Sequence, residues 1–447
     1  MPRSLVVGFG VTGRAVVEAL LGHGEEVIVV DDRVDESMTA IASALGITLV
    51  ASPTTDELAD LVAGCDAVLP SPGVPERHEI FAIAAATGVP VESEFDLASR
   101  WDSRPIVAIT GTDGKTTVTT LVTEMLEASG IRAVACGNTD TPLVEAISDP
   151  DTEVFVVEAS SFRLAVSNSF RPLVAVWLNF APDHLDAHDS LASYESAKAR
   201  IWARLDEENG LAVANAEDPV VLANRNPAVR TVTFGPPGSD ADATIVDGDL
   251  CLPDGTHVIP VDELRRSFPH DISNALAAMV AAVAAGATLE GVRRALRSFG
   301  GLSHRVQAIG ARDGVRWFDD SKATTPHAAL TAIGAFESVV LIAGGRNKGL
   351  DLSVLGGSVP PVKAVIAIGD SAEEIEAAFE GRCPIVLVKT SMDDAVAAAA
   401  QMAVSGDVVL LSPGCTSFDW FGSYAERGDE FARACRMLPN FESEVAA

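Results

Sequence analysis

Apolar and polar positions along the chain indicate an alternation of short strands and longer helices. Short runs rich in valine and isoleucine are followed by alanine-rich stretches with helical spacing. This alternation is typical of parallel sheets in which a helix connects one strand to the next, so we predict an α/β fold. The expected strands are residues 5–7, 27–30, 67–69, 106–109, 154–157, 174–178, 211–214, 315–318, 339–343, 364–368, 385–388 and 408–411.

These strands separate into three blocks, and each block has enough strands for its own sheet. A chain of 447 residues is also too long for a single core and suggests about three domains. We expect domains at residues 1–95, 96–301 and 302–447. Inside the second block, the Gly/Asp-rich segment PPGSDADATIVDGDL predicts a hairpin or a surface excursion.

The composition excludes several classes of protein. A formal net charge of −31 argues against binding of nucleic acid, which requires a basic face. The longest apolar run begins at Ala275 and is shorter than the ~20 residues of a membrane-spanning helix, so it predicts a buried helix. The six cysteines lack CxxC spacing and the first residues lack a signal sequence. We therefore expect reduced thiols in a cytoplasmic protein without membrane insertion.

The first glycine-rich turn, Gly8–Gly13, follows a predicted strand and precedes a predicted helix. Asp31 and Asp32 come about 20 residues later, as in the fingerprint of dinucleotide-binding domains. In that fingerprint a diphosphate lies at a helix N-terminus. Alone, the turn would favour an NAD-dependent oxidoreductase, although the diphosphate could belong to a substrate, or the turn could bind nothing.

The second glycine-rich turn, ITGTDGKTT at residues 109–117, indicates a nucleoside triphosphate. It is not a strict phosphate-binding loop, because Ile109 occupies the position of the first glycine. Backbone N–H groups at the start of the following helix can still bind phosphate. Lys115 adds a positive charge, and the Thr116 hydroxyl can reach Mg²⁺.

Acidic and histidine side chains follow the next two strands. Glu158 ends one strand, where its carboxylate is well placed to hold a metal ion. The loop NFAPDHLDAHDS contributes Asp183, His184, Asp186 and His188. We assign His184 to the site and interpret Asp186 and His188 as residues that form hydrogen bonds within the loop.

Lysine is scarce in this chain, which has 26 arginines but only six lysines. A lysine retained in such a chain can mark a position that requires a compact, reactive amine, although chance is an equal explanation. The six are Lys115, Lys198, Lys322, Lys348, Lys363 and Lys389.

In combination, these motifs resemble those of the Mur ligases, the ATP-dependent enzymes that add amino acids to the peptidoglycan precursor. The similar segments are GTDGKTT, EASSFRL, DHLDAH, YESAKARI, DDSKATTP, GGRNKG and SPGCTSFDWF, in family order over nearly the whole chain. The resemblance implies a Rossmann-like N-terminal domain, a central P-loop ATPase-like α/β domain and a C-terminal Rossmann-like α/β domain. DDSKATTP and GGRNKG are most similar to the member that adds D-glutamate.

The implied reaction joins D-glutamate to UDP-N-acetylmuramoyl-L-alanine through an acyl phosphate, with ATP and two Mg²⁺ ions. The implied partners are these small molecules, and we expect a monomer. Another Mur-type or folylpolyglutamate-type ligase is an alternative. So is a non-catalytic nucleotide-binding switch.

The resemblance also implies roles for individual residues. Lys115, His184 and Lys198 would be catalytic, and a CO₂-derived carbamate on Lys198 would make it a metal ligand. The implied metal ligands are Thr116, Glu158, His184 and Lys198. The implied ATP contacts are Gly111, Thr112, Gly114, Lys115, Thr116, Thr117, Asn274, Arg305 and Asp320. The implied UDP-sugar contacts are Gly10, Val11, Thr12, Asp31, Asp32, Arg33, Gly73 and Asn138. The implied D-glutamate contacts are Lys322, Thr324, Lys348, Ser417, Phe418 and Tyr424. Lys363 and Lys389 have no implied role.

Some residues depart from the family pattern. The differing positions are Asp113 and Asp271 in place of Asn, Arg163 in place of Gln, Thr139-Asp140 in place of Ile-Gly, and Tyr424 in place of Phe. None is an implied metal ligand or the phosphate-binding lysine. We therefore expect these departures to affect specificity more than the class of reaction.

Overall fold

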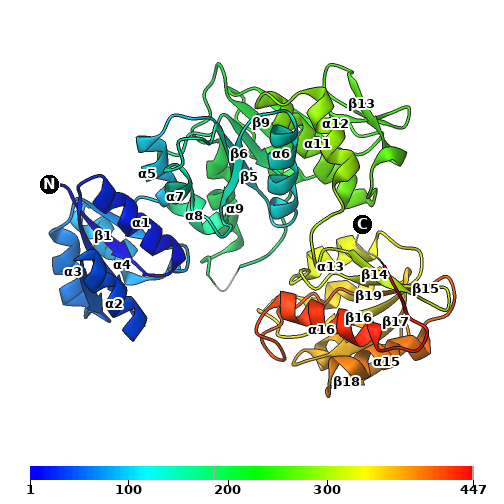
Figure 1. Cartoon of the computed structure of the whole chain (residues 1–447). Coiled ribbons are helices and arrows are strands. Elements are labelled where there is room, and N and C mark those ends of the chain that lie inside the picture. The colour runs from blue at the N-terminus through cyan, green and yellow to red at the C-terminus, as the bar shows by residue number, and fades with distance from the viewer. Residues whose placement is uncertain (185–186, 445–447) are drawn as a thin grey trace. The chain divides into compact units, whose positions relative to one another are not determined.

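A computed structural model describes residues 1–184 and 187–444, and Asp186 of the predicted loop therefore lies outside the described residues. Contacts divide the chain into two compact units. The first unit consists of Met1–Phe180, Ala187–Ser267 and Asp271–Phe299. The second unit consists of the chain from Gly300 on, together with two short earlier segments that begin at Ala181 and at Phe268. The first unit, blue to green in Figure 1, contains the first two predicted blocks, and the second, yellow to red, contains the third.

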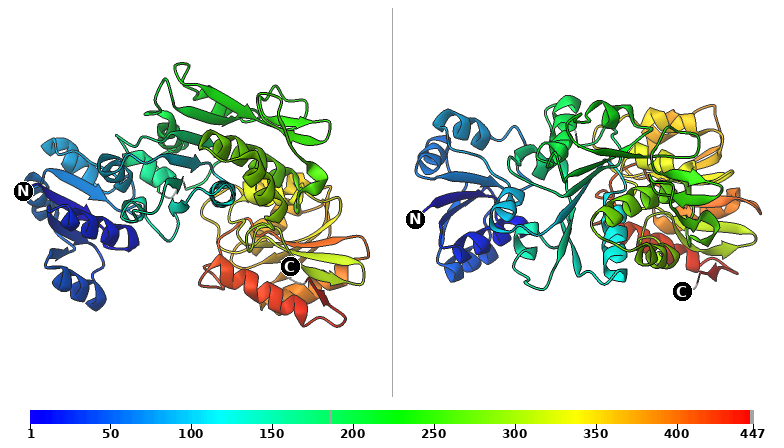
Figure 2. Two further views of the ribbon diagram at one scale, coloured as in Figure 1. Left: turned by 45° about the horizontal axis from the view of Figure 1, so that its top comes forward. Right: turned by 90° about the horizontal axis from the view of Figure 1, so that it is seen from above.

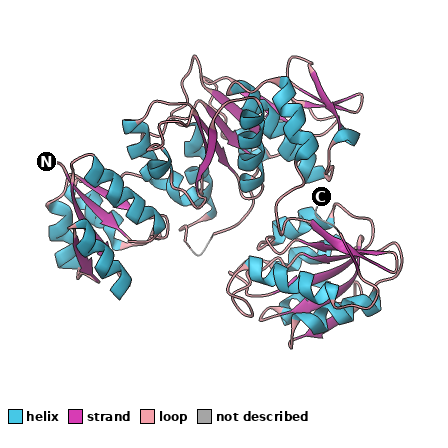
Figure 3. Ribbon diagram, in the orientation of Figure 1, coloured by secondary structure: helices cyan, strands magenta, loops and turns pink. Residues whose placement is uncertain are grey.

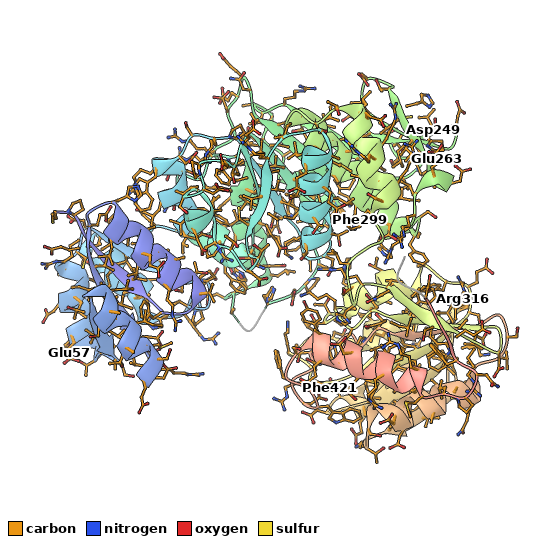
Figure 4. The ribbon with its side chains drawn as sticks, viewed as in Figure 1. Glu57, Asp249, Glu263, Phe299, Arg316 and Phe421 are labelled. Atoms are coloured by element: carbon orange, nitrogen blue, oxygen red, sulfur yellow. The ribbon has the colours of Figure 1, made fainter. Side chains whose placement is uncertain are left out.

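The first sheet is parallel and has the strand order β3-β2-β1-β4. Its strands are β1 (Arg3–Val7), β2 (Glu26–Asp31), β3 (Thr48–Ala51) and β4 (Ala67–Pro70). The accompanying helices are α1 (Val11–Gly22), α2 (Glu36–Leu45), α3 (Thr55–Ala63) and α4 (Glu79–Thr87). Helix α3 begins with a capping box between Thr54 and Glu57, the latter labelled in Figure 4. The sequence did not predict β3, a short edge strand with no fully buried residue.

The second sheet is also parallel, with the order β10-β9-β8-β5-β7-β6. Its strands are β5 (Ile106–Thr110), β6 (Ala133–Gly137), β7 (Val154–Glu158), β8 (Val174–Trp177), β9 (Leu211–Asn215) and β10 (Thr231–Phe234). The α-helices of this part are α5 (Glu94–Trp101), α6 (Lys115–Ala128), α7 (Leu143–Ala146), α8 (Ser161–Val166), α9 (Leu191–Ala199), α10 (Pro219–Ala223), α11 (Pro269–Ala284) and α12 (Leu289–Ser298).

Two predictions for the second block are confirmed. The Gly/Asp-rich segment forms the hairpin of β11 (Thr244–Val246) and β12 (Asp249–Cys251), which pairs with β13 (His257–Pro260) in a small antiparallel sheet. The long apolar run forms the buried part of α11. Among the described residues, no helix is both long and apolar enough to cross a membrane.

The third sheet has the order β18-β17-β16-β19-β15-β14-β20, parallel from β18 to β15 and antiparallel at the β14 edge. Its strands are β14 (Gln307–Arg312), β15 (Val315–Asp319), β16 (Val339–Gly344), β17 (Val362–Ile368), β18 (Ile385–Val388), β19 (Val408–Leu411) and β20 (Glu442–Ser443). Its α-helices are α13 (Pro326–Ile333), α14 (Ala372–Phe379), α15 (Met392–Met402) and α16 (Tyr424–Arg436).

Helices lie on both sides of the large sheets (Figures 2 and 3), so each central strand is buried on two faces. In β5, Val107 and Ile109 pack into one core and Ile106 and Ala108 into another. Burial on both faces explains why the central strands are continuous apolar runs in the sequence. It also leaves the carboxyl ends of the strands as the place where polar side chains can meet a ligand.

Candidate active site

The second glycine-rich turn connects the fully buried strand β5 to helix α6. Gly114, the N-cap of α6, has φ of +84°, and a Cβ there would approach Asn274 Oδ1 to 2.7 Å. Glycine is therefore required on both conformational and steric grounds. Since no side chain caps α6, the N–H groups of its first turn, which contains Thr116 and Thr117, can bind an anion.

The side chain of Asn179, just beyond β8, holds this turn in place. Its Oδ1 accepts hydrogen bonds from the backbone N–H groups of Thr112 and Asp113, each at 2.9 Å. Its Nδ2 donates to the carbonyl of Asp113 at 3.1 Å. The sequence did not predict this role, because the contact joins segments more than sixty residues apart.

The two predicted catalytic lysines of this unit meet at one carbonyl oxygen. Lys115 Nζ donates to the carbonyls of Gly111 and Thr112, at 2.9 and 2.8 Å. Lys198, on α9, is only 1 % exposed and donates to the same Gly111 carbonyl at 2.6 Å. Its ammonium also lies 4.6 Å from the centre of the Tyr194 ring. The turn is thus flanked by two cationic groups.

Glu158 ends β7 and pairs in register with Ile109 of β5, which places it beside the turn. It is buried, and its Oε1 accepts a hydrogen bond from Asn138 Nδ2 at 2.9 Å. Its Oε2 is buried and has no hydrogen-bond partner among the described residues. A buried carboxylate oxygen without a donor fits a hard cation such as Mg²⁺.

Within residues 1–184 and 187–444, no group of three or more His, Cys, Asp or Glu side chains is arranged to hold a metal by itself. A cation at Glu158 would therefore need oxygen ligands from a hydroxyl, water or a bound phosphate. His184, another implied metal ligand, belongs to the second unit; it has φ of +54°, and its Nε2 lies 3.2 Å from Asp183 Oδ2.

The first glycine-rich turn borders a cavity of about 660 Å³. All eight residues that the sequence assigned to the UDP-sugar line this one cavity: Gly10, Val11, Thr12, Asp31, Asp32, Arg33, Gly73 and Asn138. Gly8 has φ of +90°, and a Cβ on Gly13 would lie 2.0 Å from the Gly8 carbonyl oxygen. The turn therefore requires glycine at both positions.

Six predicted D-glutamate residues and two predicted ATP residues belong to the second unit. Lys322 Nζ lies 3.7 Å from the centre of the Tyr424 ring. Lys348 Nζ lies 3.9 Å from Asp183 Oδ1. Ser417 is buried whereas Phe418 is 63 % exposed. The backbone N–H of Thr324 donates to the carbonyl of Lys322, and the backbone N–H of Arg305 donates to the carbonyl of Leu302.

Asp320, one of the predicted ATP contacts, is buried in the second unit. Its carboxyl accepts hydrogen bonds from Ser412 Oγ at 2.7 Å and from the Val306 N–H at 3.2 Å. Burial raises the pKa of Asp320 to about 7. These contacts show that Asp320 supports the local backbone, and its contact with ATP stays a prediction.

Comparison with known proteins decides the family. Models of the Mur ligase MurD-like N-terminal domain, the Mur ligase middle domain and the Mur ligase glutamate ligase domain match residues 2–93, 109–282 and 304–415. A UDP-N-acetylmuramoylalanine–D-glutamate ligase from Frankia casuarinae is 42% identical, over 97% of this chain and 93% of that protein. The protein of the same name from Desulfosudis oleivorans is 38% identical, over 97% and 96%. The chain belongs to the Mur ligase family.

Solved structures agree with this fold. A pseudomurein peptide ligase type C from Methanothermus fervidus has a TM-score of 0.58 at 18% identity, covering 93% of this Mur ligase and 97% of that chain. The UDP-N-acetylmuramate–alanine ligase from Thermotoga maritima has a TM-score of 0.56 at 21% identity, covering 97% and 98%. The three-domain α/β prediction and the identification as an ATP-dependent amide ligase are confirmed.

In this Mur ligase, the carboxylate of Asp31, the last residue of β2, forms hydrogen bonds within the protein, and its contact with the UDP-sugar stays a prediction. Asp31 accepts the Phe9 N–H at 2.7 Å and the Arg33 N–H at 2.8 Å, one at each carboxylate oxygen. It therefore braces the first glycine-rich turn. The oxidoreductase alternative rested on that turn alone, and the family assignment does not favour it.

The two lysines without an implied role have structural partners in the second unit of the ligase. Lys363 Nζ lies 2.5 Å from Asp407 Oδ2, and Lys389 forms an ion pair with Glu373. All six cysteines are free thiols in the structure.

Proposed function

We propose that this Mur ligase joins D-glutamate to the L-alanine carboxylate of UDP-N-acetylmuramoyl-L-alanine, with ATP as the phosphoryl donor. The observation that carries the proposal is identity of 36–42% over nearly the full length to proteins named as ligases for this reaction. The reaction would contribute to synthesis of the peptidoglycan precursor. The two glycine-rich turns support it, because the reaction needs one site for a uridine diphosphate and another for ATP.

The residues around the second turn account for the phosphoryl transfer. The N–H groups at the start of α6 and the Lys115 ammonium would bind the phosphates of ATP, and Lys115 would exchange its two carbonyl partners for phosphate oxygens. A carboxylate oxygen of the substrate then attacks the γ-phosphorus, which gives an acyl phosphate and ADP. The amine of D-glutamate attacks the acyl carbon, and inorganic phosphate leaves with the C–O bonding electrons.

Mg²⁺ fits the Glu158 carboxylate, and the Thr116 hydroxyl is a further proposed ligand. The buried Oε2 of Glu158, which has no hydrogen-bond donor in the described chain, supports this assignment. When bound, Mg²⁺ would neutralise phosphate oxygens and let an anionic nucleophile approach them.

Lys198 is proposed to carry a carbamate that holds a second Mg²⁺. The ammonium groups of Lys198 and Lys115 share the Gly111 carbonyl, which brings two positive charges to one small acceptor. Like charges this close repel, and conversion of one amine into an anionic carbamate replaces the repulsion with attraction. Arginine cannot form this carbamate, which agrees with a lysine in a chain that has few of them.

Lys322 and Lys348 are proposed to bind the two carboxylates of D-glutamate, with Thr324, Ser417, Phe418 and Tyr424 around them. The close approach of the Lys322 ammonium to the Tyr424 ring limits the positions that this cation can adopt. A positioned cation binds a carboxylate with less loss of side-chain entropy.

Release of inorganic phosphate tests the proposed reaction. The purified chain is mixed with ATP, Mg²⁺ and UDP-N-acetylmuramoyl-L-alanine, and single amino acids are then added. We expect sustained release with D-glutamate and only background release with L-glutamate, L-lysine or meso-diaminopimelate. Release that D-glutamate does not change would contradict the proposal, and release driven by another amino acid would identify a different Mur-type ligase.

A further inference from the structure

The guanidinium of Arg163 lies at the centre of a buried network in the first unit. Arg163, on α8, is 5 % exposed. Its Nε donates to Glu94 Oε1 at 3.0 Å, Nη1 to Asn138 Oδ1 at 2.9 Å, and Nη2 to Thr12 Oγ1 at 2.9 Å. The planar guanidinium has donors on three sides in a fixed geometry, so it can make these contacts at once.

The network fixes the orientation of the Asn138 amide. Because Asn138 Oδ1 accepts from Arg163, its Nδ2 faces Glu158 and donates to Oε1. The opposite amide orientation would place an NH₂ group against the guanidinium and an oxygen against the carboxylate. Both contacts would be repulsive. Arg163 therefore determines which atom of Asn138 meets Glu158.

This orientation determines what Glu158 can offer to a ligand. With Oε1 occupied by Asn138, Oε2 is the carboxylate oxygen that no described group engages. Partners of this kind, which contact a metal ligand from behind, commonly set the direction of its lone pairs.

Glu94 balances the charge of Arg163. It lies in the first turn of α5, is 4 % exposed, and also accepts the Val144 N–H at 3.0 Å. The charge of Arg163 is therefore paired within the protein, and Arg163 itself also lines the cavity at the first turn. Its contact with Thr12, in the first turn of α1, joins the network to the wall of the cavity of about 660 Å³.

We propose that Arg163 is a positioning residue that orients the Glu158 carboxylate toward Mg²⁺ through Asn138 and connects that carboxylate to the UDP cavity. The inference rests on the proposed function in one respect, the binding of a metal by Glu158. It adds Arg163 and Glu94 to the residues on which that binding depends.

Direct metal binding tests the inference without reference to turnover. Mn²⁺ binding to the full chain with a non-hydrolysable ATP analogue is measured by electron paramagnetic resonance. The double variant Arg163→Met/Glu94→Gln removes the guanidinium together with its buried counter-charge, so that no isolated charge is left inside. We expect Mn²⁺ to bind about tenfold to a hundredfold more weakly, as for other partners behind a metal ligand.

Two further variants keep the test independent of folding. Arg163→Lys retains the pair with Glu94, but its single amine cannot reach Asn138 and Thr12 as well, so Mn²⁺ should bind severalfold more weakly. Asp102→Asn/Arg104→Met removes an ion pair of 2.6 Å next to the amino end of β5, remote from Glu158. This matched control should change thermal stability and leave Mn²⁺ binding unchanged.

Glu158→Gln separates the inference from the proposed function. If Glu158→Gln weakens Mn²⁺ binding while Arg163→Met/Glu94→Gln and Arg163→Lys leave it at the wild-type value, the positioning role is wrong and the metal assignment stands. If Glu158→Gln also leaves Mn²⁺ binding unchanged, both are wrong. Weaker binding in all three variants, but not in the control, supports the inference.

Discussion

Two glycine-rich turns in the first compact unit begin a helix in the same way but have different surroundings. One connects β1 to α1 and the other connects β5 to α6, and glycine is the N-cap of both helices without a side-chain cap. Each follows a strand in the interior of a parallel sheet. In both places, backbone N–H groups at the carboxyl edge of a sheet can face a phosphate.

The side chains around the turns distinguish them. A carboxylate, Asp31, braces the first turn, whereas a neutral carboxamide, Asn179, braces the second. Two lysines and an incompletely bonded glutamate flank the second turn. A glycine pattern therefore indicates where a phosphate can bind, but only the neighbouring charges indicate whether a phosphoryl group is transferred there.

The largest effect is expected from Lys115→Ala, which removes the cation at the second turn. We expect kcat/KM for ATP to fall about a thousandfold, the scale of losing a positioned electrostatic contact in a transition state. The affinity for UDP, measured by calorimetry, should change by less than about twofold, because the first turn is separate from this lysine. Equal losses of ATP turnover and UDP affinity would contradict the division of roles between the turns.

Lys198 is expected to act through a carbamate, so Lys198→Ala should lower kcat by about a hundredfold. Excess acetate should restore part of the activity of this variant, since it supplies a small carboxylate, whereas bicarbonate should not. Lys198→Arg is the matched control, because it keeps the positive charge but cannot be carbamylated. An active Lys198→Arg enzyme would show that the charge, rather than a carboxylate, is needed at this position.

The sequence predicted the turns and the central strands because both are local patterns. Apolar runs such as Ile106–Ile109 are buried on two faces, and their composition shows it. The strands that were missed include β3, β6, β10 and β14. In β3 and β14, partly exposed residues leave no continuous apolar run. The cavity residues were named through family resemblance, which carries spatial information that composition does not.

The braces and the network behind the metal ligand could not be predicted in the same way. Asn179 contacts residues 66 and 67 positions away, and Arg163 contacts Glu94 and Thr12 at separations of 69 and 151. Such contacts depend on the folded arrangement of several elements. Arg163 was visible in the sequence only as a departure from the family motif.

A third prediction tests the brace of the second turn. Asn179→Ala leaves the N–H groups of Thr112 and Asp113 without their acceptor, and an unmade hydrogen bond in a partly buried place costs about 1–3 kcal/mol. We expect ATP to bind roughly thirtyfold more weakly, since the turn no longer holds the shape that receives phosphate. Equilibrium binding of a fluorescent ATP analogue measures this change. Unchanged binding would mean that the glycines alone maintain the turn.

The smallest effect is expected from the corresponding change at the first turn, Asp31→Asn. The Asp31 carboxylate accepts the Phe9 N–H at one oxygen and the Arg33 N–H at the other. An amide has a single oxygen, so the Asn side chain would keep only one of these two hydrogen bonds in the same geometry. Loss of one such hydrogen bond, about 1.4 kcal/mol, corresponds to a tenfold weaker affinity for UDP. Asp32→Asn is the matched comparison: its side chain is 72% exposed, so its loss of UDP affinity should be smaller than that of Asp31→Asn. If the two variants lost affinity equally, general negative charge near the uridine end would explain the result, and Asp31 would not be a brace comparable to Asn179.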